Sequence, residues 1–122
     1  MNYLWVGIGG FFGAVSRYAL SGWINRRFQG GWFPYGTMAC NILGCLIIGI
    51  LAGIAESRSI FSPQTRLLIF VGLLGGFTTF SSFGLETIYL LRENLYLPAF
   101  LNVFVSITAG SLLLYIGLQL TK

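Results

Sequence analysis

Long apolar segments alternate along the chain with short polar stretches. The charge-free runs cover residues 1–16, 28–55, 67–85 and 94–121. A helix needs about 20 apolar residues to cross a bilayer, so these runs predict four membrane-spanning helices. We place the helices near residues 3–22, 35–56, 66–91 and 97–120.

The composition supports this interpretation. Hydrophobic residues make up 56% of the chain and charged residues only 8%, against about 25% charged residues in soluble domains. The connections between the predicted helices are short and leave no room for a soluble domain. We therefore expect an all-α membrane protein, with residues 1–122 forming a single four-helix transmembrane domain.

The third apolar run differs from a simple lipid anchor. Residues 75–83 read Gly-Gly-Phe-Thr-Thr-Phe-Ser-Ser-Phe. Paired glycines are poor helix formers, and Thr and Ser hydroxyls compete for backbone partners. This segment predicts a third helix broken at mid-membrane. Because interrupted helices build ion and substrate sites in membrane proteins, we expect a permeation protein.

The basic residues give no clear orientation signal. If the N-terminus is cytoplasmic, that side carries Arg58, Arg66 and Lys122, and the opposite side carries Arg26, Arg27 and Arg92. Orientation normally follows a cytoplasmic surplus of Lys and Arg. The balance allows an antiparallel dual-topology homodimer. A single orientation stays open, because Arg17 would tip the balance by one.

Three polar side chains lie within or near the predicted spans. The charge of Arg17 needs water, a partner or a route to the interface, so it either anchors the helix end or lines an aqueous vestibule. Asn41 lies roughly 9 Å into the second span, where its NH2 group suits an anion or a carbonyl. Glu86 could cap a helix, pair with an arginine or face a pore, and a membrane carboxylate also argues for proton or cation transport.

Aromatic residues recur every three positions in the third run. Phe77, Phe80 and Phe83 would share one face of a continuous helix. Such a stripe usually faces lipid or the core. Here it is interleaved with hydroxyls, and the positive edges of the rings could hold a small anion. Ser106 on the last span adds a polar element, or serves only to bond neighbouring helices.

Small residues are spaced for close helix contact. The pairs Gly9/Gly13, Gly49/Gly53 and Gly72/Gly76 are each four residues apart, and Gly36, Cys40 and Gly44 form one stripe. Such spacing lets helix backbones approach closely in lipid. These residues predict tight assembly and identify no substrate.

Enzyme chemistry and nucleic-acid binding find little support. The chain has no histidine, no clustered ligand set for zinc and no serine beside a base. The bases are scattered, which suits contacts with lipid headgroups better than a nucleic-acid surface.

Three motifs, taken in order, resemble the Fluc (CrcB-type) fluoride channel family. They are Gly9-Gly10-x-x-Gly13-Ala14-x-x-Arg17-Tyr18, Pro34-Tyr35-Gly36-Thr37-x-x-x-Asn41-x-x-Gly44, and residues 75–83 with Glu86. The similarity extends from the first helix to the end of the third. Cys40 stands where the family more often has valine, and Ser82 where it often has threonine.

The resemblance implies a passive fluoride exporter of the bacterial inner membrane, which lowers cytoplasmic fluoride and its toxicity. It implies two identical chains inserted antiparallel, with two ion pathways and a structural central sodium ion. The pore residues that the resemblance implies are Asn41, Phe80 and Phe83. We add Thr79, Ser81 and Ser106 as candidate pore residues because of their hydroxyls. Arg17, Thr37 and Glu86 would be vestibule or structural polar residues. The backbone carbonyls of Gly75 and Thr78 would bind the sodium ion.

Two other functions are alternatives to the fluoride channel. Small multidrug transporters are also four-spanning and often dual-topology, but they couple protons through a carboxylate in the first helix, and this chain has no Asp or Glu before Glu56. A non-transporting assembly subunit would explain the glycines and leave the Thr/Ser/Phe segment unexplained.

Overall fold

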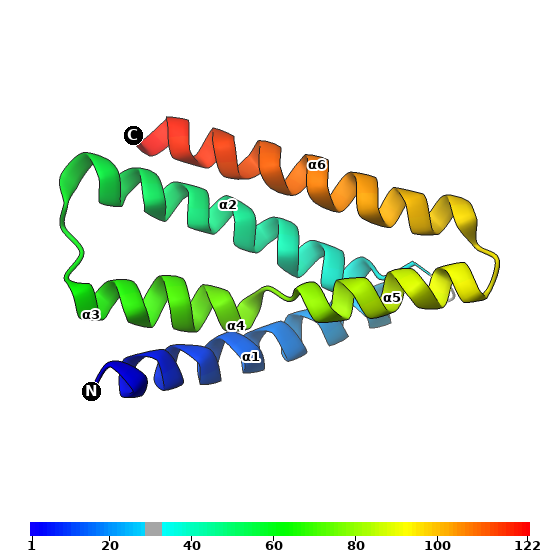
Figure 1. Ribbon diagram of the computed structural model, residues 1–122, viewed down its shortest axis with the longest axis horizontal. Coiled ribbons are helices and arrows are strands. Elements are labelled where there is room, and N and C mark those ends of the chain that lie inside the picture. The colour runs from blue at the N-terminus through cyan, green and yellow to red at the C-terminus, as the bar shows by residue number, and fades with distance from the viewer. Residues whose placement is uncertain (29–32) are drawn as a thin grey trace.

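The computed structural model describes residues 1–28 and 33–122, and these residues form helices joined by short connections. The helices are α1 (Asn2–Arg27), α2 (Tyr35–Arg58), α3 (Pro63–Arg66), the π-helix η1 (Leu67–Leu74), α4 (Gly75–Phe77), α5 (Phe80–Arg92) and α6 (Tyr96–Thr121). The segments from α3 to α5 follow one line, so the chain passes back and forth along its long axis and both termini lie at the same end (Figure 1).

Three of these segments are long and apolar enough to cross a membrane. They are Tyr35–Arg58, Pro63–Arg92 and Tyr96–Thr121. Each agrees with the predicted helix to within a few residues. The first helix is also 26 residues long, but it carries three arginines and continues five residues beyond the predicted end at residue 22. Arg17 therefore lies well inside α1 and not near its end.

Two helix pairs make up the bundle. The most extensive contact is between α2 and α6, and the next is between α1 and η1, continued by α4. Figure 1 shows α1 crossing beneath the third segment. The expected close glycine contacts are confirmed. A β-carbon added at Gly72 would lie 2.7 Å from the Val6 carbonyl oxygen, and one at Gly76 would lie 2.8 Å from the Gly10 oxygen.

Because α1 and the third segment lie so close, we expect a larger side chain at Gly76 to reduce stability strongly. Gly76→Val is expected to lower the free energy of unfolding by about 1–3 kcal/mol, because its Cβ would meet the backbone of α1 and not a movable side chain. Gly7→Ala is the matched control, since nothing lies within 4 Å of its added carbon. Denaturant titration in detergent would measure both. Equal stability of Gly76→Val and the parent chain would contradict the packing described here.

The third segment is broken about halfway along, as predicted, and the break lies within residues 75–83. Gly75 and Gly76 are helical, and the extended residues are Thr78 (φ −93°, ψ 155°) and Thr79 (φ −149°, ψ 122°). The glycines directly follow a π-helical stretch, and at Gly76 the lack of a side chain allows the close contact with α1. The break therefore falls on the two threonines that follow the paired glycines.

The break also separates the phenylalanines that a continuous helix would align. Phe77 is only 9% exposed, whereas Phe80 is 83% exposed. The expectation that Phe77 shares a face with Phe80 and Phe83 is wrong, because two extended residues reset the helical register. Only Phe80 and Phe83 remain on the same helix, with ring centroids 5.8 Å apart.

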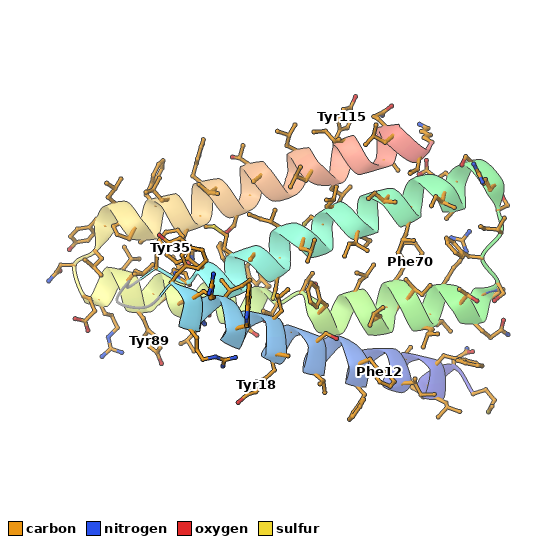
Figure 2. The ribbon with its side chains drawn as sticks, turned by 180° about the vertical axis from the view of Figure 1, so that it is seen from behind. Phe12, Tyr18, Tyr35, Phe70, Tyr89 and Tyr115 are labelled. Atoms are coloured by element: carbon orange, nitrogen blue, oxygen red, sulfur yellow. The ribbon has the colours of Figure 1, made fainter. Side chains whose placement is uncertain are left out.

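Large apolar side chains cover the outside of the bundle. In Figure 2, Phe12, Tyr18 and Tyr115 point away from the neighbouring helices, while Phe70 points from η1 toward α2. Exposed Phe, Tyr, Leu and Ile occur on α1, α2, α5 and α6 alike. Such a surface suits lipid and further protein contacts, not water.

Candidate functional site

The helix break opens into a cavity of about 360 Å³ between the third segment, α2 and α6. We call it the break cavity. Five of the residues predicted for the pore and the sodium site line it: Asn41, Gly75, Thr78, Thr79 and Phe80. Residues from two helices, distant in sequence, are therefore brought together as the motifs suggested.

Asn41 holds the break in place. Its Nδ2 donates to the Thr79 carbonyl oxygen at 2.9 Å, and the Thr79 N–H donates to its Oδ1 at 2.7 Å. One side chain thus satisfies both backbone groups of an extended residue, which a membrane interior requires. Since the amide NH2 carries two hydrogens, one N–H remains for another acceptor.

The carbonyl end of the broken helix faces the same cavity. Thr78 donates from its N–H at 3.0 Å and from its Oγ1 at 2.9 Å to the Leu74 carbonyl oxygen. Arg17 donates from Nε to the Gly76 oxygen at 3.1 Å. Among the described residues, the carbonyl oxygens of Gly75 and Thr78 accept no hydrogen bond. Their oxygens fit a hard cation, which prefers oxygen ligands.

The amide end of the break begins at α5. Thr79 caps this helix, because its Oγ1 accepts from the Ser82 N–H at 3.2 Å and lies 3.3 Å from Ser81 Oγ. Within the described chain the first two amides of α5, at Phe80 and Ser81, donate no hydrogen bond. Helix N-termini with open amides favour anions. The break therefore presents oxygens on one side and N–H groups on the other.

A second, more polar cavity of about 500 Å³ lies between α1, α2 and α5. Arg17, Thr37 and Glu86, the three residues predicted as vestibule or structural polar groups, all line it, together with Arg26 and others. We call it the polar cavity. Thr37, only 8% exposed, donates from Oγ1 to Glu86 Oε1 at 2.6 Å. The other carboxylate oxygen of Glu86 is buried and has no partner among the described residues.

Three predicted pore residues line neither cavity. Phe83 is half-buried next to Phe80, Ser81 is exposed, and Ser106 on α6 has a buried Oγ without a partner in the described part of the chain. The structure of one chain therefore does not join them to the break cavity.

Sequence reasoning missed a buried polar pair between α5 and α6. Asn102 is 1% exposed, and its Nδ2 donates to Thr87 Oγ1 at 2.9 Å. Thr87 donates in turn to the Phe83 carbonyl oxygen at 2.7 Å. The signal was present, since Asn102 is an amide inside a charge-free run, four residues before Ser106. These hydrogen bonds fix the position of α6 along α5, close to the helical turn that contains Phe83.

Comparison with known proteins decides the family. A family model described as CrcB-like protein, Camphor Resistance (CrcB), matches residues 4–118. The chain belongs to this family. The CrcB relatives include the "Fluoride-specific ion channel FluC" of Methylobacillus flagellatus, 47% identical over 117 residues, which are 96% of this chain and 91% of the relative. Proteins of the same name from Chlorobium phaeobacteroides and Chloroflexus aurantiacus are 44% and 42% identical, over 98% and 99% of this chain and 91% and 95% of theirs.

Membership in the CrcB family confirms the resemblance found in the motifs. The relatives are ion channels by name, so the expectation that this chain is not an enzyme is confirmed. Together with three segments able to span a bilayer, the family also confirms a multi-pass location in the bacterial membrane.

Proposed function

We propose that this chain is a fluoride-specific channel that exports fluoride passively and so lowers its toxicity in the cytoplasm. The observation that carries the proposal is the break at Thr78 and Thr79. It places an anion-favouring helix N-terminus and an exposed phenylalanine beside a row of membrane-buried polar groups. The names of the CrcB relatives supply the identity of the ion.

The proposed pathway for fluoride uses many weak donors and no fixed charge. The ring edges of Phe80 and Phe83 carry partial positive charge. The hydroxyls of Thr79 and Ser81 and the remaining N–H of Asn41 add hydrogen-bond donors. Together these groups replace the water around a small anion, and several weak sites let the ion leave again. Ser106 continues the pathway along α6.

The polar cavity serves as the vestibule of this pathway. Arg17 and Arg26 give it positive character, which raises the local concentration of anions. The Glu86 carboxylate accepts a hydrogen bond from the Thr37 hydroxyl. We assign Glu86 a structural role and no proton transport.

A structural sodium ion completes the carbonyl end of the break. The oxygens of Gly75 and Thr78 have no hydrogen-bond donors among the described residues, and they lie in one cavity. Two oxygens from one chain are too few for a hard cation, which takes six to eight in the calcium case. A second copy supplying the same pair would double the number. Sodium bound there would neutralise the carbonyl dipoles at the centre of the assembly.

The working unit is an antiparallel homodimer of four-spanning chains with two pores. The open break cavity and the 83% exposure of Phe80 support a second copy on this face. The balance of basic residues between the two sides, three against three, supports insertion in both orientations. Both termini at one end of the bundle agree with four crossings, α1 included (Figure 1).

Ion flux from liposomes tests the proposed function. Vesicles holding purified protein and loaded with fluoride should release it down its gradient, as a fluoride electrode would record, whereas chloride-loaded vesicles should not release chloride. Flux should follow the fluoride gradient and the voltage only. Equal release of the two anions, or uphill movement driven by a pH gradient, would refute a passive fluoride channel.

Dual topology predicts a mixed population of chains. Reporter tags on the C-terminus should appear on both sides of the membrane in comparable amounts, because the basic residues are balanced. Adding two or three lysines to one loop should bias insertion and reduce flux unless an oppositely biased copy is co-expressed. A single orientation of the unaltered protein would exclude the antiparallel dimer.

The proposed sodium site predicts different effects at its two residues. Within one chain there is room at Gly75, where the atom nearest an added Cβ is the Phe70 oxygen at 3.8 Å. Gly75→Val should therefore leave the chain helical but weaken the dimer, measured by cross-linking in sodium-containing detergent. Thr78→Ser keeps the hydroxyl bond to Leu74 and should be mild. Full dimer stability and flux with no cation able to occupy the site would disprove the assignment.

A further inference from the structure

An apolar groove of about 450 Å³ runs between α1, α2 and α6, on a different face of α2 from the break cavity. Ile24 and Phe28 of α1, Met38 and Leu46 of α2, and Leu113 of α6 are among the residues that line it, with Tyr35 at one end. Neither the pathway proposed for fluoride nor the sodium site uses this groove.

The two adjacent arginines at the end of α1 serve different surfaces. Arg26 lines the polar cavity. Arg27 lines neither the polar cavity nor the groove, but it directly precedes Phe28, which lines the groove. Its guanidinium carbon is 5.8 Å from the centre of the ring of Trp23, a cation–π distance that keeps the charge beside the residue that precedes Ile24.

The residues around Arg27 are those that mark a membrane interface. Trp23 is 54% exposed and Tyr35 is 42% exposed, and the rings of Phe28 and Tyr35 lie 5.3 Å apart. Trp and Tyr gather where headgroups meet the hydrocarbon region. The groove then runs from this level down between α2 and α6, toward Leu46 and Leu113.

We propose that this groove binds one anionic phospholipid, with its phosphate on Arg27 and an acyl chain along the groove. Charge complementarity decides the occupant. A permanent cation at headgroup depth, at the end of α1 that borders an apolar groove, fits a molecule that has an anion at one end and a hydrocarbon chain at the other. The site does not depend on the ion that the protein conducts.

Quenching of Trp23 fluorescence by brominated lipid tests the site. A Trp5→Phe, Trp32→Phe background leaves Trp23 as the only tryptophan. The protein is reconstituted in phosphatidylcholine vesicles that contain a minor fraction of chain-brominated phosphatidylglycerol or, for comparison, of chain-brominated phosphatidylcholine. We expect about fivefold stronger apparent binding of the anionic lipid, as a single juxtamembrane base provides. Equal quenching by the two lipids would overturn the proposal.

Four variants distinguish a specific lipid site at Arg27 from a general attraction of anionic lipids to the basic residues at this end of the protein. Arg27→Gln should abolish the preference, and Arg27→Lys should keep most of it. Arg26→Gln, one residue away at similar depth, should leave the preference intact. Ala39→Phe fills the groove and should reduce quenching although Arg27 is unchanged. A preference that survives Arg27→Gln, or that falls equally in Arg26→Gln, would overturn the proposal, as would quenching by neither lipid because a second copy covers this face.

Discussion

Replacing Phe80 or Phe83 with isoleucine is expected to reduce fluoride flux by up to about tenfold for each ring. Isoleucine keeps apolar bulk and removes the ring quadrupole. Edge-on contacts between two aromatic rings contribute about 0.5–1.5 kcal/mol, and we take the contact of fluoride with a ring edge to be of the same order. Phe80 is the more revealing of the two. It is 83% exposed in the single chain, so its replacement leaves few intramolecular contacts to lose. Fluoride efflux from liposomes, normalised to the amount of protein, is the measurement.

Two controls test whether a loss of flux comes from the pore and not from misfolding or from loss of proton coupling. Each variant should still migrate as a folded dimer in detergent, because isoleucine fills most of the space of the ring. Glu86→Gln should retain substantial flux, since its amide oxygen can still accept the hydrogen bond of Thr37. A proton-coupled transporter would behave in the opposite way and lose transport in Glu86→Gln. Wild-type flux in both phenylalanine variants would refute the pore assignment.

The helices were largely predictable because lipid imposes a simple rule on them. Every backbone group must be satisfied within the membrane, so long charge-free runs become helices. The boundaries of α2, α6 and the third segment follow from this rule. The end of α1 does not, because the residues after Gly22 are amphipathic and belong to the interface, where helix and loop are both tolerated.

The position of the break could not be read from local propensity. Gly75 and Gly76 are the weaker helix formers, yet both remain helical, and Gly76 packs against α1. The extended backbone lies at Thr78 and Thr79, where Asn41 supplies partners from another helix. Two hydrogen bonds from another helix thus outweigh the local helix preference. Because Asn41 lies outside the third apolar run, the sequence of that run alone does not show where the break occurs.

Part of the candidate site was predictable as a set of residues, but its contacts were not. The motifs placed Asn41, Thr79 and Phe80 together, and the structure brings them to one cavity. The pairing of Asn102 with Thr87 was not anticipated, because spacing along one helix does not show which neighbour it faces. For the same reason the sequence did not distinguish the surroundings of Arg26 from those of Arg27.

Asn41→Leu is expected to be the most destabilising polar substitution in the chain. The change leaves the N–H and the carbonyl of Thr79 without partners inside the membrane. Each unpaired buried group is expected to lower the free energy of unfolding by about 1–3 kcal/mol. The break would then re-form as a continuous helix or open to lipid, and either outcome removes the α5 N-terminus from the break cavity. Denaturant titration in detergent measures the loss of stability, and hydrogen exchange at the Thr79 amide shows whether the break itself is affected.

Asn41→Asp separates the two roles of this residue. The carboxylate still accepts from the Thr79 N–H, so stability should fall less than in Asn41→Leu. It cannot donate when ionised, and its negative charge beside the proposed path should suppress fluoride flux. Asn2→Leu gives the same chemical change on the exposed first turn of α1 and should alter neither property. Parent-like stability and unchanged protection of the Thr79 amide in Asn41→Leu would show that another group holds the break.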